Sequence, residues 1–512
     1  MTFAWFQNYQ SRILVAAAAG AGLGFLGSSI VNVALPTFQS ELDADATDIQ
    51  WIVSAFNLAI AALLLSAGAF SDRHGHLRIF RLGLVTYAGA SVVCAIAWDP
   101  TTLIVGRAFQ GLASALLVPS SLGIVNTTYP PEQRGRAVGL WSSFSAVAGG
   151  LGPLLAGVLL GFASWRYLFW INIPIVLLVW WLLGSNHNIA SQTRAKPPFD
   201  WPGACYSVLA LGFLTYAAIE SSTLGIAHPA VLVLVAIAGM AATAFIRRQQ
   251  CNENPLMPLA MFRSRNFVAA NIVTFLAYCS IGGGFYVMML TWIQIQGYSP
   301  LAAGAITLPF MLFTGGLAHP IGTLVRHIGP KLPLSAGVLL LGIGFFGFSL
   351  ADIGASFWVA YFPGVILTAA GIALIVAPVT TVIMGSVELR QSGTASGINS
   401  AIARSAVLLS VAVLGAIHID LFEQTAATGI TALQLTPTLD AHMHAELSKM
   451  AAAEIPPEIN PRITAAIREV IVNAFMHAAR VVMMIAGGLS ILGAAIAFFS
   501  IESLRAHPRA RG

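Results

Sequence analysis

The stretch Gly68–Arg81, GAFSDRHGHLRIFR, separates two long apolar runs and determines how the rest of the chain is oriented. It is short, begins with a glycine, and places Arg73, Arg78 and Arg81 around one acid, Asp72. Short loops rich in Lys and Arg stay on the cytoplasmic side of a membrane. The stretch therefore predicts a cytoplasmic turn between two membrane-spanning helices.

The composition excludes an ordinary soluble domain. Hydrophobic residues make up 57% of the 512 residues and charged residues 9%, whereas soluble domains carry about 25% charged residues. This balance is typical of an all-α, multi-pass membrane protein. The net charge of +5 comes from residues scattered through short loops, which set topology, so no nucleic-acid partner is expected.

Apolar runs of about 20 residues are needed to cross a bilayer, and fourteen such runs are expected. With the N-terminus inside, most of the 25 Lys and Arg residues fall in expected cytoplasmic segments, as the positive-inside rule requires. We therefore expect both termini in the cytoplasm and a first run that is retained rather than cleaved as a signal peptide. The expected spans are 13–36, 49–70, 79–97, 102–125, 137–160, 167–184, 203–220, 229–247, 267–291, 301–323, 333–351, 356–380, 398–417 and 479–501.

An internal repeat indicates two halves. The spacing from Gly68 to Gly75 recurs from Gly322 to Gly329, in GTLVRHIGPK, between the tenth and eleventh expected spans. Parallel six-helix repeats are one way in which transporters are built. The expected domains are an N-terminal six-helix bundle at 1–186, a linker with two inserted helices at 187–250, and a C-terminal six-helix bundle at 251–512.

One extramembrane segment is long, the loop 418–478. Its stretches LDAHMHAELSKMAAA and PRITAAIREVIVNAFMHAARVV have helix-forming composition, and the second runs into the last expected span. We expect a helical hairpin there, on the outer face.

The glycine-flanked turn also carries a family signature. Gly68, Asp72, Arg73, Gly75 and Arg78 match the pattern G-x-x-x-D-R-x-G-x-x-R, which resembles the loop between helices 2 and 3 of the major facilitator superfamily. Further stretches resemble one branch, the fourteen-helix drug:proton antiporter family of the EmrB/QacA type: IVNVALP from Ile30, LIVGRAFQGLASA, WRYLFWINIP and QIQGYSPLAAG. The resemblance implies the major facilitator fold, two six-helix bundles plus two inserted helices, 14 transmembrane helices in all.

The fifth expected span contains the stretch GGLGPLLAG from Gly149 to Gly157. Small residues every four positions form a smooth stripe that lets helices pack closely in a membrane, and Pro153 favours a bend. Close packing alone would explain the stripe. The sequence GGLGPLLAG also resembles the antiporter motif of exporters in the superfamily. The resemblance implies export rather than uptake and assigns the motif to Gly149, Gly150, Gly152, Pro153 and Gly157.

Arg107 lies in the fourth expected span, where an arginine is costly and needs partners inside the protein. It could bond to carbonyls near the outer interface, or, as the resemblance implies, act in coupling together with Gln110. The family commonly has an aspartate in the first span, and Gly27 occupies that place here. No acidic residue lies in the middle of any expected span. The remaining candidate proton carriers are His319 and Glu220. A histidine titrates near pH 6.5 and could carry a proton, and Glu220 is an acid at the outer end of the seventh expected span.

The resemblance gives Asp72 a gating role, assisted by Arg73 and Arg78. Its carboxylate would accept hydrogen bonds from the start of the thirteenth span, near Gly397, in the state closed to the cytoplasm. The alternative is a local surface pair with Arg73 or Arg78, worth at most about 1 kcal/mol.

Aromatic and amide side chains on the spans expected to line a central cavity are the candidate substrate contacts. Such a wall without an acid suits a lipophilic neutral or anionic compound, since a dication would need a carboxylate partner. The candidates are Phe25, Asn32, Phe56, Asn57, Trp141, Phe144, Phe275, Tyr278, Tyr286, Trp292 and Phe310.

These features predict a secondary transporter of the bacterial inner membrane that exports hydrophobic small molecules by alternating access, with proton antiport. The alternatives are a lipid or metabolite exporter without simple proton coupling, because of Gly27, and a non-transporting membrane sensor, which would be expected to carry a soluble signalling domain. The expected partners are membrane lipid, a small lipophilic substrate, protons and, as a further candidate, a periplasmic adaptor. No P-loop, catalytic cluster, metal site or cofactor is expected, and we do not expect an enzyme.

Overall fold

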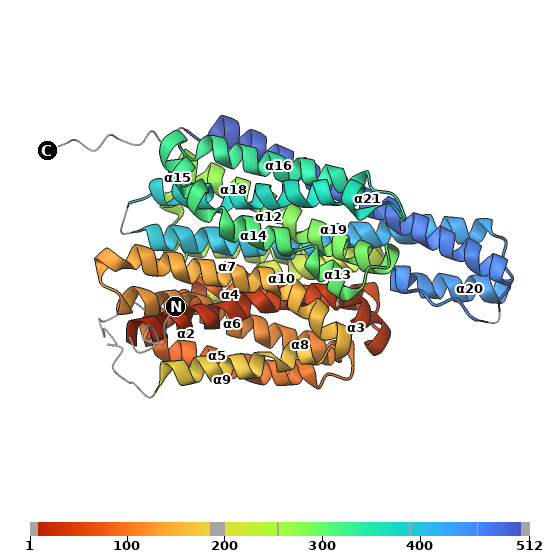
Figure 1. The fold of residues 1–512 in the computed structure, drawn as a ribbon, viewed down its shortest axis with the longest axis horizontal. Helices are drawn as coiled ribbons and strands as arrows, with labels where there is room; N and C mark the ends of the chain where they lie inside the picture. The colour runs from red at the N-terminus through yellow and green to blue at the C-terminus, as the bar shows by residue number, and fades with distance from the viewer. Residues whose placement is uncertain (1–8, 185–199, 253–254, 389–390, 458, 503–512) are drawn as a thin grey trace. The chain divides into compact units, whose positions relative to one another are not determined.

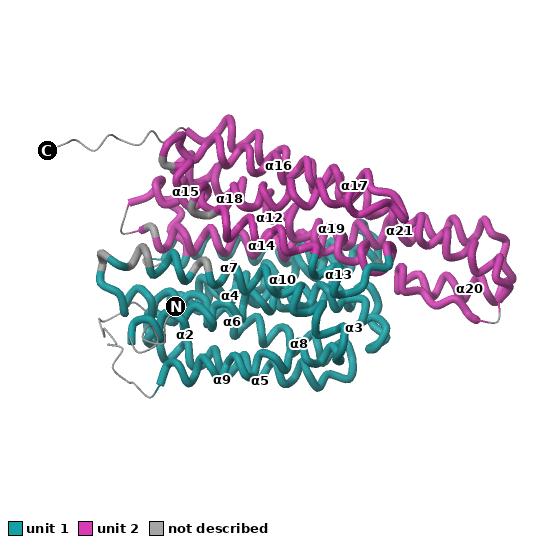
Figure 2. The backbone as a smooth tube through the Cα atoms, in the orientation of Figure 1, with its two compact units in different colours: residues 1–256, 297–305 teal, residues 257–296, 306–512 magenta. Residues whose placement is uncertain are grey.

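A computed structural model describes residues 9–184, 200–252, 255–388, 391–457 and 459–502, and all the regular secondary structure in these segments is helical (Figure 1). Most of the expected linker after residue 186 lies outside the described residues. The chain forms two compact units (Figure 2). Unit 1 consists of residues 1–256 and 297–305, and unit 2 of residues 257–296 and 306–512.

Unit 1 contains the following elements: α2 Tyr9–Ser29, η1 Ile30–Val33, α3 Leu35–Leu42, α4 Ala46–His74, α5 His76–Ala95, α6 Pro100–Thr128, α7 Pro131–Phe162, α8 Tyr167–Trp170, α9 Asn172–Leu183, α10 Trp201–Leu224, α11 Pro229–Cys251 and α13 Pro300–Ala305.

Unit 2 contains the remaining elements: η2 Leu259–Arg263, α12 Arg265–Leu290, η3 Thr291–Ile295, α14 Leu308–Gly316, α15 Ala318–Ile328, α16 Lys331–Ser349, α17 Phe357–Ala360, α18 Phe362–Gly385, α19 Ser392–Ala432, α20 Pro437–Glu446, η5 Leu447–Ala452 and α21 Pro461–Ser500.

Local sequence signals explain where the helices of unit 1 begin and end. Asp45 starts α4 with a capping box, in which its carboxylate accepts from the amide of Asp48 at 2.7 Å. α6 has a simpler cap, in which the carboxylate of Asp99 accepts from the amide of Thr102, and Pro100 follows in the first turn. The expected turn at Gly68–Arg81 is shorter than the sequence suggests, because only Gly75, with φ of 95°, interrupts the helices. A positive φ is readily adopted by glycine, so a single residue is enough to separate α4 from α5.

Within the described residues, 11 helices are long and apolar enough to cross a membrane. Three shorter apolar segments, Val147–Phe162, Tyr167–Leu183 and Pro300–Gly316, coincide with the fifth, sixth and tenth expected spans. The sixth is broken between α8 and α9, and the tenth between α13, α14 and α15. Helices broken at membrane depth are tolerated in transporters where they are buried in protein or line a cavity. The count of fourteen spans stays a prediction.

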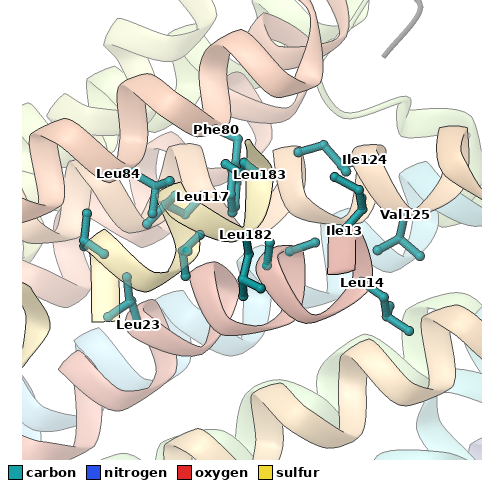
Figure 3. Close-up of a cluster of buried hydrophobic side chains, with 14 of the residues drawn as sticks. Ile13, Leu14, Leu23, Phe80, Leu84, Leu117, Ile124, Val125, Leu182 and Leu183 are labelled. Carbon is teal, nitrogen blue, oxygen red and sulfur yellow. The ribbon is translucent and has the colours of Figure 1, made fainter. Parts of the chain in front are cut away.

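The core of unit 1 forms where α2 lies among α5, α6 and α9. Figure 3 shows the buried side chains of this cluster, among them Leu23 from α2, Phe80 from α5, Leu117 from α6 and Leu182 from α9. α2 and α5 can approach this closely only because residue 20 is a glycine, since a Cβ at Gly20 would lie 2.3 Å from the ring of Phe80. The first span is therefore embedded in unit 1 on several sides.

The two longest helices belong to unit 2. α19 has 41 residues and α21 has 40, or about 60 Å each, twice the hydrocarbon thickness of about 30 Å. Figure 1 shows α20 and the adjoining ends of α19 and α21 projecting beyond the other helices of unit 2. Phe422, Met443 and Phe475 are buried within this projection. The helical hairpin predicted for 418–478 is confirmed, and its position on the outer face stays a prediction.

Candidate functional site

Arg107 is the central charged side chain of unit 1. It lies on α6, is 1% exposed, and donates from Nε to the carbonyl of Ile52 at 3.3 Å and from Nη1 to Oε1 of Gln110 at 2.9 Å. Its guanidinium carbon lies 4.1 Å from the ring centroid of Phe56 on α4. A carbonyl, an amide and an aromatic face therefore surround a charge that is expensive to bury. Among the described residues, no carboxylate pairs with Arg107.

Gln110 extends this arrangement into a polar network that links α5, α6 and α9. Its Nε2 donates to Oγ of Ser91 at 2.8 Å, and Nδ2 of Asn172 donates to the same oxygen at 3.2 Å. These side chains are at most 2% exposed. Buried polar groups that satisfy one another fix helix positions, because breaking one bond leaves a partner without solvent. The network holds Gln110 in the orientation that receives Arg107.

Gly27, where the family's acid is absent, faces the same region. A Cβ at Gly27 would lie 2.4 Å from the hydroxyl of Tyr87 and 3.4 Å from ring carbons of Phe56. Tyr87 is fully buried and donates to the carbonyl of Leu23, one turn before Gly27, at 2.8 Å. The ring of Phe56 thus contacts both Arg107 and the surface of Gly27. Tyr87 and Phe56 therefore fill the space directly beside Gly27.

The first half of the GGLGPLLAG motif packs against the end of the first span. Oγ of Ser29 donates to the carbonyl of Gly149 at 2.7 Å. A Cβ at Gly152 would lie 2.1 Å from that same oxygen and 3.0 Å from the amide nitrogen of Ile30. This is where α2 passes into the tight helix η1. α7 therefore contacts the first span through backbone atoms.

The second half of the motif packs against α13. A Cβ at Gly157 would lie 2.4 Å from the carbonyl oxygen of Pro300, and one at Gly304 would lie 2.3 Å from that of Pro153. At Gly161, one turn further along α7, a Cβ would have nothing within 4 Å. The glycine stripe is thus in contact at Gly157 and open at Gly161.

Asp72 and Arg73 lie in the last turn of α4 and Arg78 lies in the first turn of α5, and all three are exposed. The side chain of Asp72 is 66% exposed, and its Oδ1 lies 3.8 Å from Nε2 of His76. Asp72 therefore has His76 as a local partner, which the sequence did not suggest. The gating role of Asp72, Arg73 and Arg78 stays a prediction.

The candidate substrate contacts differ in how open they are. Phe144 is 51% exposed, whereas Asn57 and Tyr286 are 1% and 3% exposed and contact protein in this structure. Trp141 donates from its indole to Oγ of Ser121 at 3.1 Å. Phe310 packs edge-on against Phe285. The remaining candidates that are half-buried are Phe25, Asn32, Phe275 and Tyr278.

The candidate proton carriers have different surroundings. Glu220 is half-buried on α10, four residues before that helix ends. His319 lies on α15, and its side chain is outside the described part of the structure. Both stay predictions.

Sequence reasoning missed Tyr87, Ser91 and Asn172. Tyr87 and Ser91 lie in an apolar run without a motif, and Asn172 lies in the stretch WRYLFWINIP, where the resemblance gave it no role. The role of each depends on side chains from other helices. One signal in the sequence could have pointed to them, namely the absence of the expected acid at Gly27. That absence suggests a search of the neighbouring helices for other polar side chains.

Residues 17–411 of the chain match the Major Facilitator Superfamily. The chain is 30% identical over 465 residues to the multidrug resistance protein Stp of Mycobacterium tuberculosis (strain CDC 1551 / Oshkosh), which covers 88% of this chain and 83% of Stp. It is 29% identical over 498 residues to the tetracenomycin C resistance and export protein of Streptomyces glaucescens, covering 95% of this chain and 91% of that protein.

A solved structure supports the fold. The crystal structure of a bacterial homologue of the human lysosomal transporter Spinster, in an inward-facing and occupied conformation, superposes with a TM-score of 0.64. The match covers 98% of this chain and 99% of the other at 16% sequence identity. At that identity the likeness extends to the fold alone.

Proposed function

The chain belongs to the Major Facilitator Superfamily, and we propose that it exports hydrophobic small molecules of the drug-efflux type by alternating access. The superfamily is one of transporters, so the chain is a multi-pass membrane transporter and not an enzyme. Relatives named for multidrug resistance and for antibiotic export, at about 30% identity over most of the chain, support the proposed substrate class.

The relatives named for resistance and export carry this proposal, and the structural feature that supports it is the glycine motif on α7. Gly152 lies against Ser29 and Ile30, and Gly157 lies against Pro300. The contacts are between backbones, so any side chain at these positions would push the helices apart. The residues match the antiporter motif of superfamily exporters, and their contacts join the motif to the end of the first span and to α13.

We propose fourteen membrane crossings of the EmrB/QacA type, with both termini in the cytoplasm of a bacterium. The 11 long helices and the three shorter apolar segments fall at the fourteen expected positions. The inserted pair is α10 and α11, and α10 packs on α4 through Ser207, whose hydroxyl donates to the carbonyl of Ala62 at 2.9 Å. The two inserted helices belong to unit 1.

Proton antiport is the proposed energy source, with Arg107 and Gln110 as the coupling residues and His319 or Glu220 as the proton carrier. The competing proposal is a lipid or metabolite exporter without simple proton coupling. One observation favours that alternative: Tyr87 and Phe56 occupy the space beside Gly27 that a carboxylate would need.

A pair of glycine variants tests the proposed function. Gly157→Ala places a methyl group 2.4 Å from the carbonyl oxygen of Pro300, whereas Gly161→Ala places one in open space. In everted membrane vesicles that take up either ethidium or fluorescein through the wild type, Gly157→Ala should lower uptake of that dye about tenfold or more, because α7 and α13 are pushed apart. Gly161→Ala should transport normally. Equal activity of the two variants, at matched expression, would contradict the role given to α7.

A further inference from the structure

A polar track runs between α12 and α19 inside unit 2, and no motif assigns it a role. Nδ2 of Asn399 donates to Oδ1 of Asn271 at 3.1 Å and to Oγ1 of Thr274 at 2.8 Å. Further along both helices, Sγ of Cys279 donates to the carbonyl of Ala406 at 3.5 Å. Contacts that advance in the same direction on both helices make the pair parallel and fix its register.

This register places Arg404 of α19 level with Tyr278 of α12, and the two side chains are close enough to interact electrostatically. Arg404 follows the first residue of α19, Ser392, by about 18 Å of helix. Counted from residue 398, where the expected span starts, Arg404 lies about 9 Å into a hydrocarbon core of about 30 Å. An arginine at that depth faces protein or a water-filled cavity.

The face of α19 that carries Arg404 is open and polar. Residues at positions i, i+4, i+7 and i+11 share one face of a helix. The side chains on this face that precede Leu408 are small or polar and are exposed or half-buried, and the next two in line, Leu408 and Val411, are buried. A lipid-facing surface would carry large apolar residues instead. The open face consists of Gly393, Gly397, Ser400 and Arg404.

The helices around this face supply no negative charge at that depth. α12 and α18, which both pack on α19, contain no Asp or Glu. The first acid along α19 is Asp420, about 24 Å beyond Arg404. On α21 the acid is Glu469, near the start of the helix in the projecting part. Within the described residues of α12, α18, α19 and α21, Arg404 is therefore the charged side chain at that depth.

We propose that Arg404 binds the negatively charged group of an exported lipophilic organic anion, with Tyr278 beside it contacting the apolar body of that compound. A guanidinium offers two parallel N–H donors to a carboxylate or sulfonate, and the ring of Tyr278 offers an aromatic surface next to them. The inference rests on the export function proposed above and narrows its substrate class. An anion that enters along the open face of α19 would meet the guanidinium of Arg404 at the end of that face.

Two dyes of opposite charge test the proposal. Export of fluorescein, an organic anion, and of ethidium, an organic cation, is measured in proteoliposomes containing the wild type, Arg404→Gln, Arg404→Lys or the control Arg480→Gln. Arg480 is an arginine of the same unit that pairs with Asp352 on an exposed surface. The KM for fluorescein should rise about tenfold or more in Arg404→Gln, because one charge-assisted contact is lost. It should rise less in Arg404→Lys, which keeps the charge, and Arg480→Gln should behave as the wild type.

The outcomes separate the two proposals. Export of ethidium but not fluorescein by the wild type would overturn the anion site and leave the export function standing. Equal losses for both dyes in Arg404→Gln would show a structural role and also overturn the site. If the wild type exported neither dye, the export function would fail in this assay. Fluorescein binding to the purified protein, followed by fluorescence polarisation, would then decide the site: binding unchanged by Arg404→Gln refutes it, and weaker binding supports it.

Discussion

Replacing Gly27 by alanine should destabilise unit 1, because α2 meets Tyr87 and Phe56 with no room for a methyl group. The new Cβ would lie 2.4 Å from the hydroxyl of Tyr87 and 3.4 Å from the ring of Phe56. Tyr87 is fully buried and is tied to the carbonyl of Leu23 by a hydrogen bond of 2.8 Å. It can move away only by giving up that bond or by pushing α2.

The magnitude follows from three opposing effects. Overpacking a dense interior costs about 1–3 kcal/mol, and losing the hydrogen bond of Tyr87 costs about 1 kcal/mol. The higher helix propensity of alanine offsets up to about 1 kcal/mol. The net destabilisation of Gly27→Ala is therefore about 1–3 kcal/mol, which for a chain of 512 residues lowers the Tm by roughly 1–3 °C.

Thermal unfolding of the detergent-purified protein, followed by tryptophan fluorescence, measures this change. Gly161→Ala is the matched control, since a Cβ there has nothing within 4 Å. Tyr87→Phe removes the clashing hydroxyl, so Gly27→Ala should cost at least about 1 kcal/mol less in the Tyr87→Phe background. A Tm of Gly27→Ala equal to that of the wild type, or a cost that Tyr87→Phe does not reduce, would refute this description of the Gly27 site.

Three further substitutions test the site and the fold. Arg107→Gln should lower transport more than tenfold, because Gln110 loses its charged partner. Arg166→Gln, a half-buried arginine outside this network that pairs with Glu41, is measured alongside and should not lower it. Asp72→Asn should slow transport while membrane insertion, followed by fluorescence of a fused reporter, stays normal; wild-type rates would exclude gating by Asp72. Burial raises the pKa of Asp200, but hydrogen bonds, first from Arg248 and then from Gly203, lower it below its ordinary value of 3.8. The Asp200–Arg248 pair therefore stabilises the α10–α11 hairpin above about pH 4, and this contribution is lost as the pH falls through the lowered pKa. Asp200→Asn should lower the Tm at pH 7, and the difference from the wild type should shrink as the pH falls below about 4.

The sequence predicts the membrane helices well because burial in lipid leaves a long apolar signal. The helices of the 418–478 hairpin follow from helix-forming composition, and the structure confirms them. The breaks in the sixth and tenth expected spans were not predicted, although Pro174 follows the first break and Pro309 lies at the second. A proline alone does not locate a break, because Pro119 and Pro153 lie inside continuous helices. Those breaks depend on tertiary packing.

In the candidate site, too, some features can be predicted from the sequence and others depend on tertiary packing. The missing acid at Gly27 and the intramembrane Arg107 can both be read from the sequence. What replaces the acid cannot, because Tyr87 and Phe56 come from α5 and α4, far along the chain from Gly27. Arg404 was visible as a charge within a span, but only the register of α12 and α19 indicates which side chain it faces.

The most direct test of the central claim, proton-driven export, is reconstitution of the purified protein into proteoliposomes with an imposed pH gradient. Movement of ethidium and fluorescein is followed with the gradient in each direction, and again after nigericin collapses it. The proposed antiport predicts that export runs against the inward flow of protons, reverses when the gradient is reversed, and stops with the ionophore. Transport at the same rate with and without the gradient would contradict it.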